Sequence, residues 1–145
     1  GIPERHVKKM DPTLSHCLSD GNCCSLRSKA HKYCYKHQVL ETSKLCADDL
    51  GLSNDQWGVS FQSRIGPGWL QPFTDKVLEE FPKNGIKKIA VVCPAFIADN
   101  LETLEEVDIR ARETFLDSGG DEFTFIPCIN DNKLWIDFLA NFIEK

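Results

Sequence analysis

The chain has 145 residues, of which 41% are hydrophobic and 27% charged, and its net charge is −5 at pH 7. These values are typical of a globular domain that buries a core, and they exclude a disordered chain. The negative charge, with basic residues scattered along the sequence, argues against nucleic acid as a partner. No apolar run approaches the ~20 residues of a membrane-spanning helix. The sequence begins without methionine, so we expect a piece of a longer protein.

The first third of the chain predicts one helix after a polar, irregular stretch over residues 1–30. A helix is expected from about His31 to Leu50, with Gly51 as its stop. Its apolar stripe falls at regular helical spacing: Tyr35, Val39, Thr42, Cys46 and Leu50. A strand is predicted from Trp57 to Phe61, and after a turn-rich stretch a helix from about Phe73 to Phe81.

The remaining sequence predicts two more strand–helix units. The continuous apolar run within Ile86–Phe96 is typical of a strand covered on both faces of a parallel sheet. Asp99 or Asn100 is expected to cap a helix that runs to about Leu116. The apolar stripe predicted for that helix is Leu104, Val107, Ala111 and Phe115. A third strand, Phe123–Ile126, precedes a cap within 130–132 and a final apolar helix.

Repeated strand–helix units predict an α/β fold, a three-layer, Rossmann-like parallel sheet with helices on both faces. Three strands make a thin sheet, and no strand precedes the first helix. We therefore expect one further strand upstream of residue 1.

Cysteines gather at one end, since five of the seven lie in the first 46 residues together with all four histidines. An odd, clustered set differs from the disulfide framework of a small secreted domain and favours a reduced, cytoplasmic setting. Cys17, Cys23, Cys24 and Cys34 are enough soft ligands for a [2Fe–2S] centre or structural zinc; free thiols are the alternative. Because adjacent cysteines rarely both reach one metal, Cys46 or a nearby histidine could replace one of them.

Three stretches resemble the ferrochelatases, in the order and at the spacing of that family. They are Gly1-Ile-Pro-Glu-Arg-His6, the segment from Ser60 to Pro72 that contains Phe-Gln-Ser-Arg and Trp69, and Cys93-Pro-Ala-Phe-Ile-Ala-Asp-Asn-Leu-Glu-Thr-Leu-Glu-Glu106. The resemblance implies a chelatase-like fold of two similar α/β domains around a cleft, each with a four-stranded parallel sheet. Residues 1–145 would form part of the C-terminal domain, with a Cys-rich insertion at about 13–36.

The resemblance implies a lyase of haem biosynthesis. Such an enzyme inserts ferrous iron into protoporphyrin IX or coproporphyrin III and releases two protons. The nearest enzyme alternative inserts cobalt into another tetrapyrrole, and the Phe-Gln-Ser-Arg segment favours ferrochelatase. From a different class, the chain could be a non-catalytic iron–sulfur or zinc module that acts as a redox or metal sensor.

Glu102 matches the catalytic glutamate of the family, which accepts a pyrrole proton. The histidine that partners it in the family would precede Gly1, so the 145 residues alone are expected to be inactive. Asp99, Glu102 and Glu106 lie on one side of the predicted helix and suit a path for iron. Alternatively, the helix macrodipole alone favours acidic residues in a first turn. Asn100 and Arg110 depart from the family's pattern.

The resemblance also implies porphyrin-binding residues. Trp69 would stack on the macrocycle and Arg64 would pair with a propionate, while Gln62 and Ser63 are weaker candidates. The alternative is a tryptophan that covers a loop and polar residues that satisfy turn backbone. The loop before Trp69 is one residue shorter than the commonest family form.

Some bacterial members of the family carry a [2Fe–2S] cluster in an insertion at this place, and the Cys17–Cys34 segment resembles theirs. The expected cofactor is therefore that cluster, with zinc as the second choice. The expected partners are porphyrin, ferrous iron and the N-terminal half of the same enzyme. Peripheral contact with a membrane is left open.

Overall fold

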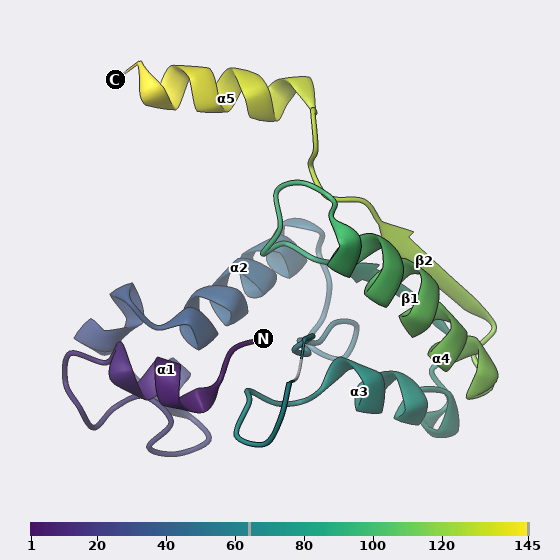
Figure 1. Cartoon of the computed structure of the whole chain (residues 1–145), viewed down its shortest axis with the longest axis horizontal. Helices are drawn as coiled ribbons and strands as arrows, with labels where there is room; N and C mark the ends of the chain where they lie inside the picture. Colours follow the sequence, from purple (N-terminus) through teal and green to yellow (C-terminus); the bar gives the residue numbers. More distant parts are fainter. Residues whose placement is uncertain (64, 145) are drawn as a thin grey trace. The chain divides into compact units, whose positions relative to one another are not determined.

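The computed structural model describes residues 1–63 and 65–144, and the chain divides into two compact units, Gly1–Val77 and Leu78–Lys145 (Figure 1). Each unit has a small apolar core of its own. Whether all 145 residues form part of one C-terminal domain stays a prediction.

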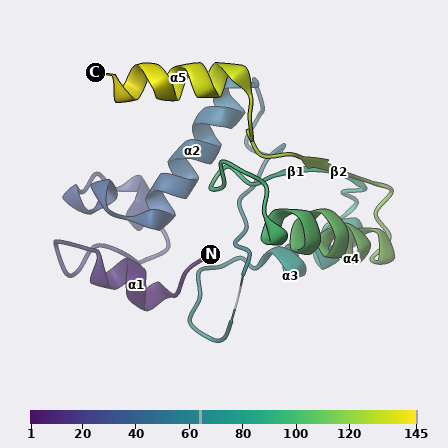
Figure 2. The same cartoon turned by 45° about the horizontal axis from the view of Figure 1, so that its top comes forward.

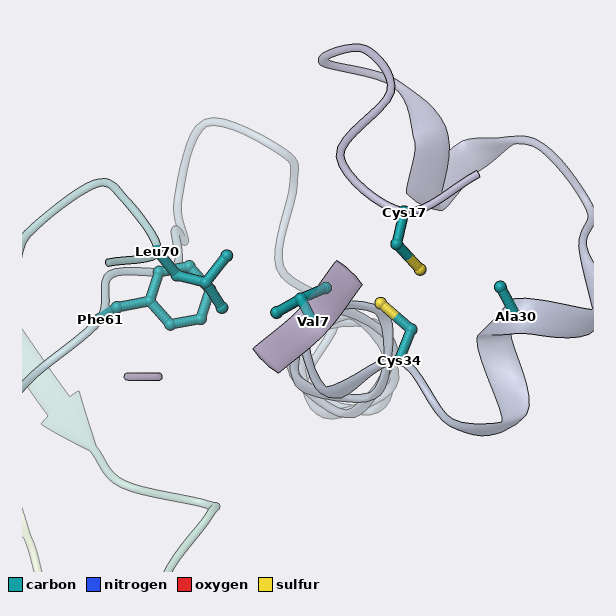
Figure 3. Close-up of a cluster of buried hydrophobic side chains, with 6 residues drawn as sticks. All are labelled: Val7, Cys17, Ala30, Cys34, Phe61 and Leu70. Carbon is teal, nitrogen blue, oxygen red and sulfur yellow. The ribbon is translucent and has the colours of Figure 1, made fainter. Parts of the chain in front are cut away.

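The first unit is mainly helical. It contains α1 (Glu4–Lys9), two short 3₁₀ turns, η1 (Cys23–Ser25) and η2 (Lys29–Lys32), and the long helix α2 (Tyr35–Asp49). Its core gathers side chains from all along the unit (Figure 3): Val7, Cys17, Ala30, Cys34, Phe61 and Leu70. The stretch predicted to be irregular thus contributes one helix and half of this core.

The helix α2 confirms the predicted helix, and it ends as expected at Gly51. The Leu52 N–H bonds to the Ala47 carbonyl at 2.9 Å and the Gly51 N–H to that of Asp48 at 3.1 Å. This is the Schellman arrangement, and Gly51 adopts the left-handed φ of 68° that it requires. The predicted apolar stripe is wrong in its second half: Tyr35 and Val39 pack on the core, whereas Leu50 is 72% exposed.

The predicted strand Trp57–Phe61 is wrong. Only an isolated bridge joins Phe61 to Phe73, with the Phe61 N–H bonded to the Pro72 carbonyl at 2.8 Å. A strand needs a partner along its length, and the described residues provide none for 57–60. The chain instead returns through a turn-rich stretch to α3 (Thr74–Glu80), which is close to its predicted bounds.

The second unit confirms the α/β class. Strands β1 (Lys88–Val92) and β2 (Glu122–Ile126) pair in parallel, with Ile89 opposite Phe123 and Val91 opposite Phe125. A helical crossover joins them, and its side chains pack with β2 and α3 around Leu78, Ala111, Phe115 and Phe123. Among the described residues alternate side chains of β1 are exposed, so only one face of this strand is covered (Figure 2).

The crossover consists of a π-helical segment, η4 (Glu102–Ala111), followed by α4 (Arg112–Asp117). Its buried side chains recur every four residues, at Thr103, Val107, Ala111 and Phe115. The predicted stripe placed Leu104 in the core, but Leu104 is 49% exposed. The error has a physical cause: hydrogen bonds to the fifth residue widen the turn, so positions four and five apart align better than positions three apart.

The short 3₁₀ turn η3 (Pro82–Asn84) precedes β1, and α5 (Lys133–Ile143) closes the chain. The side chain of Asn132 accepts the Leu134 N–H at 3.0 Å, which confirms the predicted cap. Helix α5 buries none of its residues. In the part of the chain that the structure describes, no helix is long and apolar enough to cross a bilayer.

Candidate functional site

The start of η4 is fixed by Asn100, which lies in the loop after β1. Its side-chain oxygen accepts the N–H groups of Glu102 at 2.9 Å and of Thr103 at 3.3 Å. In return the Asn100 N–H bonds to the Thr103 hydroxyl at 2.9 Å. This reciprocal cap satisfies backbone donors at the helix start and places Glu102 in its first turn.

The carboxylate of Asp99 joins the loop after β1 to the segment after β2. It accepts hydrogen bonds from the Asn130 amide at 2.7 Å, the Cys128 N–H at 3.2 Å and the Thr103 hydroxyl at 3.1 Å. These bonds, that from Asn130 foremost, lower the pKa of Asp99 although burial opposes the shift. Its predicted role as an iron ligand stays a prediction, and any cation there would compete with these three donors.

Glu102 differs from its acidic neighbours. Its side chain is half-buried, and among residues 1–63 and 65–144 its carboxylate accepts no hydrogen bond and forms no ion pair. Burial raises the pKa of the Cys93 thiol, and the charges of Asp99 and Glu102 add to that rise. The Glu102 carboxylate is thus available as a base at the carboxyl end of β1.

Glu106 is held by Arg110, at 3.6 Å across one turn of η4. The same guanidinium lies closer to Glu105, at 2.6 Å, a pairing five residues apart that suits the wide turn of a π-helix. Arg110, the departure noted in the sequence, therefore offsets part of the charge of the acidic row.

Two of the three sequence motifs are hydrogen-bonded to each other in the first unit. The Glu4 N–H bonds to the Gly68 carbonyl at 2.8 Å, and the Leu70 N–H to that of Ile2 at 3.1 Å. Gly1 approaches so closely that an added Cβ would lie 2.7 Å from the Gln62 carbonyl oxygen. Trp69 is thereby fixed beside the opening motif, with its side chain half-buried.

Ser63, a predicted porphyrin-binding residue, has an uncommon conformation. Its φ is 65°, in the left-handed region, and its buried hydroxyl has no hydrogen-bond partner among the described residues. Strain and an unsatisfied polar group of this kind concentrate at functional sites. Gln62 precedes it in the loop. Arg64, the predicted propionate partner, lies outside the described residues.

The four predicted cluster cysteines come together in the first unit, and three of them are buried: Cys17, Cys23 and Cys34. The sulfur atoms of Cys23 and Cys24 lie 4.0 Å apart. Those of Cys17 and Cys34 point toward one another (Figure 3). Burial and a hydrogen bond with Cys34 raise the pKa of the Cys17 thiol to about 12. Burial and the neighbouring Cys23 do the same for Cys24, also to about 12.

The same region contains the histidines and the cysteine that were suggested as replacement ligands. A nearby histidine was one suggested replacement ligand, and three histidines lie together in this unit: the rings of His31 and His37 are stacked with centroids 3.7 Å apart, and the ring of His16 meets that of His31 edge-on at 5.4 Å. The His31 Nε2 lies 3.3 Å from the Cys23 carbonyl oxygen. The Leu18 N–H donates to the Cys23 sulfur at 3.4 Å. Cys46, the suggested replacement ligand, is exposed on α2.

The donor set of the first unit suits one of the two expected cofactors better than the other. Within residues 1–63 and 65–144, no three His, Cys, Asp or Glu side chains are arranged around one metal-ion position. A [2Fe–2S] centre does not require three side chains around one ion position, because each of its two irons takes two of the four thiolates. The four thiols of the first unit match the number of ligands that such a centre takes, and an N–H donor is aimed at the sulfur of Cys23, whereas no described group surrounds a single zinc position.

The fold and these residues define an α/β protein with an acidic helix start at the carboxyl end of its parallel strands. The chain belongs to the ferrochelatase family, whose model matches residues 1–145. The ferrochelatase of Pseudomonas fluorescens (strain Pf0-1) is 46% identical over 147 residues, covering 100% of this chain and 43% of that protein. That of Opitutus terrae is 50% identical over 142 residues, covering 97% and 41%. The chain therefore spans less than half the length of the relatives that it matches.

Proposed function

We propose that this protein inserts ferrous iron into a porphyrin, protoporphyrin IX or coproporphyrin III, as a cytoplasmic lyase of haem biosynthesis. Membership of the ferrochelatase family over the whole chain supports the reaction. The observation that carries it is the half-buried Glu102 carboxylate, which no described hydrogen-bond donor or cation occupies.

Insertion requires that two pyrrole N–H groups lose their protons while iron exchanges its water ligands for ring nitrogens. A carboxylate within hydrogen-bond reach can accept such a proton, and an unoccupied one does so without breaking an existing bond. The cap at Asn100 fixes the backbone that carries Glu102. The N-terminal half of the same enzyme is the proposed partner, and it would supply the second base.

The acidic neighbours serve the other substrate in this proposal. Asp99 and Glu106 would guide ferrous iron toward the ring as hard oxygen ligands. Their present bonds, with Asn130 and Arg110 respectively, keep them in place until iron arrives. On the porphyrin side Trp69 would stack on the macrocycle, with Gln62, Ser63 and Arg64 beside its polar edge.

The test is Glu102→Gln in the full-length protein, assayed under anaerobic conditions by the loss of porphyrin fluorescence as iron enters. We expect metallation to fall by at least about 100-fold, the range that a lost general base costs. Glu105→Gln is the matched control on the same segment, because Glu105 is already paired with Arg110. It should stay within a few-fold of the parent. A fully active Glu102→Gln variant would refute the assignment.

We further propose a [2Fe–2S] cluster held by Cys17, Cys23, Cys24 and Cys34, with structural zinc as the second choice. The support is the convergence of these thiols and the N–H donor at Cys23. Such a cluster adds one-electron chemistry to the protein when it is bound. A non-catalytic module that senses metal or redox state is the alternative that the same thiols favour, and it predicts a full-length protein that metallates no porphyrin.

The cluster is tested by the absorption spectrum and the iron and sulfide content of anaerobically purified full-length protein. We expect visible charge-transfer bands that are lost in Cys23→Ser. Cys46→Ser is the matched control, because Cys46 is exposed on α2 and should leave the bands unchanged. A colourless parent that contains zinc would replace the iron–sulfur assignment, and equal loss in both variants would show that Cys23 has no special role.

A further inference from the structure

We propose that Asp11 positions and tunes the proposed iron–sulfur cluster: its buried carboxylate shapes the loop that presents Cys17 and places a negative charge beside that ligand. The inference rests on the cluster proposed above. Asp11 was not singled out in the sequence, where it follows α1 in a polar stretch. In the structure it is 3% exposed, the only buried carboxylate of the described residues.

The loop after α1 folds around this carboxylate. One oxygen, Oδ1, accepts the N–H and the hydroxyl of Thr13, at 2.8 and 2.7 Å. The other, Oδ2, accepts the N–H groups of His16 and Cys17, both at 2.8 Å. Four short bonds to a single side chain fix the backbone up to the first cluster cysteine. Asp11 therefore sets the position of Cys17 from within the loop.

The backbone of the loop would not hold this shape unaided. Leu14 and Leu18 have φ values of 61° and 60°, in the left-handed region that strains residues other than glycine. Leu14 and Leu18 lie on either side of Cys17. Asp11 accepts the N–H groups of His16 and Cys17 between them, and it accepts two further bonds from Thr13, directly before Leu14. Strain of this kind persists only where surrounding contacts enforce it, and these bonds are contacts of that kind.

The charge of Asp11 acts in addition to its position. The Asp11 carboxylate lies beside Cys17, because its Oδ2 accepts the Cys17 N–H at 2.8 Å. All four of its described bonds point a donor at a carboxylate oxygen, and this arrangement suits the ionised form. A fixed negative charge beside one ligand opposes the addition of an electron to the cluster and lowers its reduction potential.

The test measures the midpoint potential of the cluster by a reductive titration of the full-length protein, together with its cluster content. Asp11→Asn keeps the shape of the side chain but removes its charge and two of its acceptor sites. We expect a midpoint potential shifted to more positive values and a partial loss of the visible bands. Asp20→Asn is the matched control on the same loop. The Asp20 side chain is exposed to solvent, and among the described residues it accepts a hydrogen bond only from the Asn22 N–H. This control should change neither quantity.

A second variant separates position from charge. Thr13→Val removes one of the four donors and leaves the carboxylate charged, so cluster content should fall slightly while the potential does not rise. If Asp11→Asn retains too little cluster to titrate, Asp11→Glu restores the charge and should recover part of the bands at a potential near that of the parent. A raised potential in Asp11→Glu would overturn the charge argument.

The outcomes separate this inference from the cluster itself. A parent without charge-transfer bands overturns the cluster proposal and the inference with it. A parent with bands, and an Asp11→Asn variant with the same potential and cluster content, overturns the role of Asp11 alone. An equal shift in Asp20→Asn would assign the effect to the net charge of the loop rather than to Asp11.

Discussion

At the scale of single residues, the acidic side chains of the second unit fall into two kinds. Asp99, Glu105 and Glu106 are already bonded to neighbours, whereas the Glu102 carboxylate has no hydrogen bond or ion pair among the described residues. The sequence motif singled out Glu102 as the catalytic candidate, with Asp99 and Glu106 as further iron ligands. It could not show which carboxylates are already bonded, because partners such as Asn130 come from distant parts of the chain. The same limit applies to Asp11, whose donors are local but whose burial depends on the whole core of the first unit.

Thr103 provides a residue-scale prediction. It is 0% exposed, and its hydroxyl bonds to both Asp99 and Asn100. Thr103→Val keeps the shape but removes one of the three described donors to the Asp99 carboxylate and leaves the Asn100 N–H without its described partner, which costs about 1–3 kcal/mol of unfolding free energy. Urea denaturation measures the loss. The matched control is Thr114→Val, which removes only a bond to the Arg110 carbonyl one turn away and should change stability by less than ~0.5 kcal/mol. Equal effects in the two variants would contradict the role given to Thr103.

At the scale of elements, periodicity predicted the helices and caps that depend on local sequence. It failed for the strand, whose formation depends on a second strand to pair with. Helices α2 and α5 form where they were expected, and β1 lies inside the predicted segment Ile86–Phe96, because apolar spacing and caps are local signals. The strand expected at 57–61 forms only the Phe61–Phe73 bridge, since the described residues give 57–60 no strand to pair with. The π-helical turns of η4 shifted the core stripe from Leu104 to Thr103, since the pattern was matched to an α-helical repeat.

The end of α2 carries an element-scale prediction. Gly51→Ala puts a Cβ into a left-handed conformation, which costs about 1–2 kcal/mol, although nothing lies within 4 Å of that Cβ. Gly58→Ala is the matched control, because its surroundings are equally open and its φ is not positive. It should be neutral or stabilise the chain by a few tenths of a kcal/mol. Thermal unfolding of both variants measures the difference, and a Gly51→Ala variant as stable as Gly58→Ala would exclude strain at the helix end.

At the scale of the molecule, the chain contains two small cores and a good deal of uncovered apolar surface. All of α5 is exposed or half-buried, including Leu134 at 81% and Ile143 at 79%. Alternate residues of β1 are exposed as well. The relatives are more than twice as long as the region they share with this chain. Composition and periodicity predicted the α/β class. They do not show which apolar side chains, such as those of α5, stay exposed to solvent in these 145 residues.

The hydrogen bonds at both ends of the loop between Phe61 and Trp69 bear on how the length of this loop can vary in evolution. Phe61 is bonded to Pro72 and Thr74, and the residues around Trp69 are bonded to the opening motif. Both ends of the loop are therefore anchored, and lengthening or shortening such a loop changes its closure entropy only slightly. A residue can be gained or lost between the anchors while the indole of Trp69 keeps its place. The resemblance implies a loop one residue shorter than the commonest family form, and the two anchors allow such a difference without displacing Trp69.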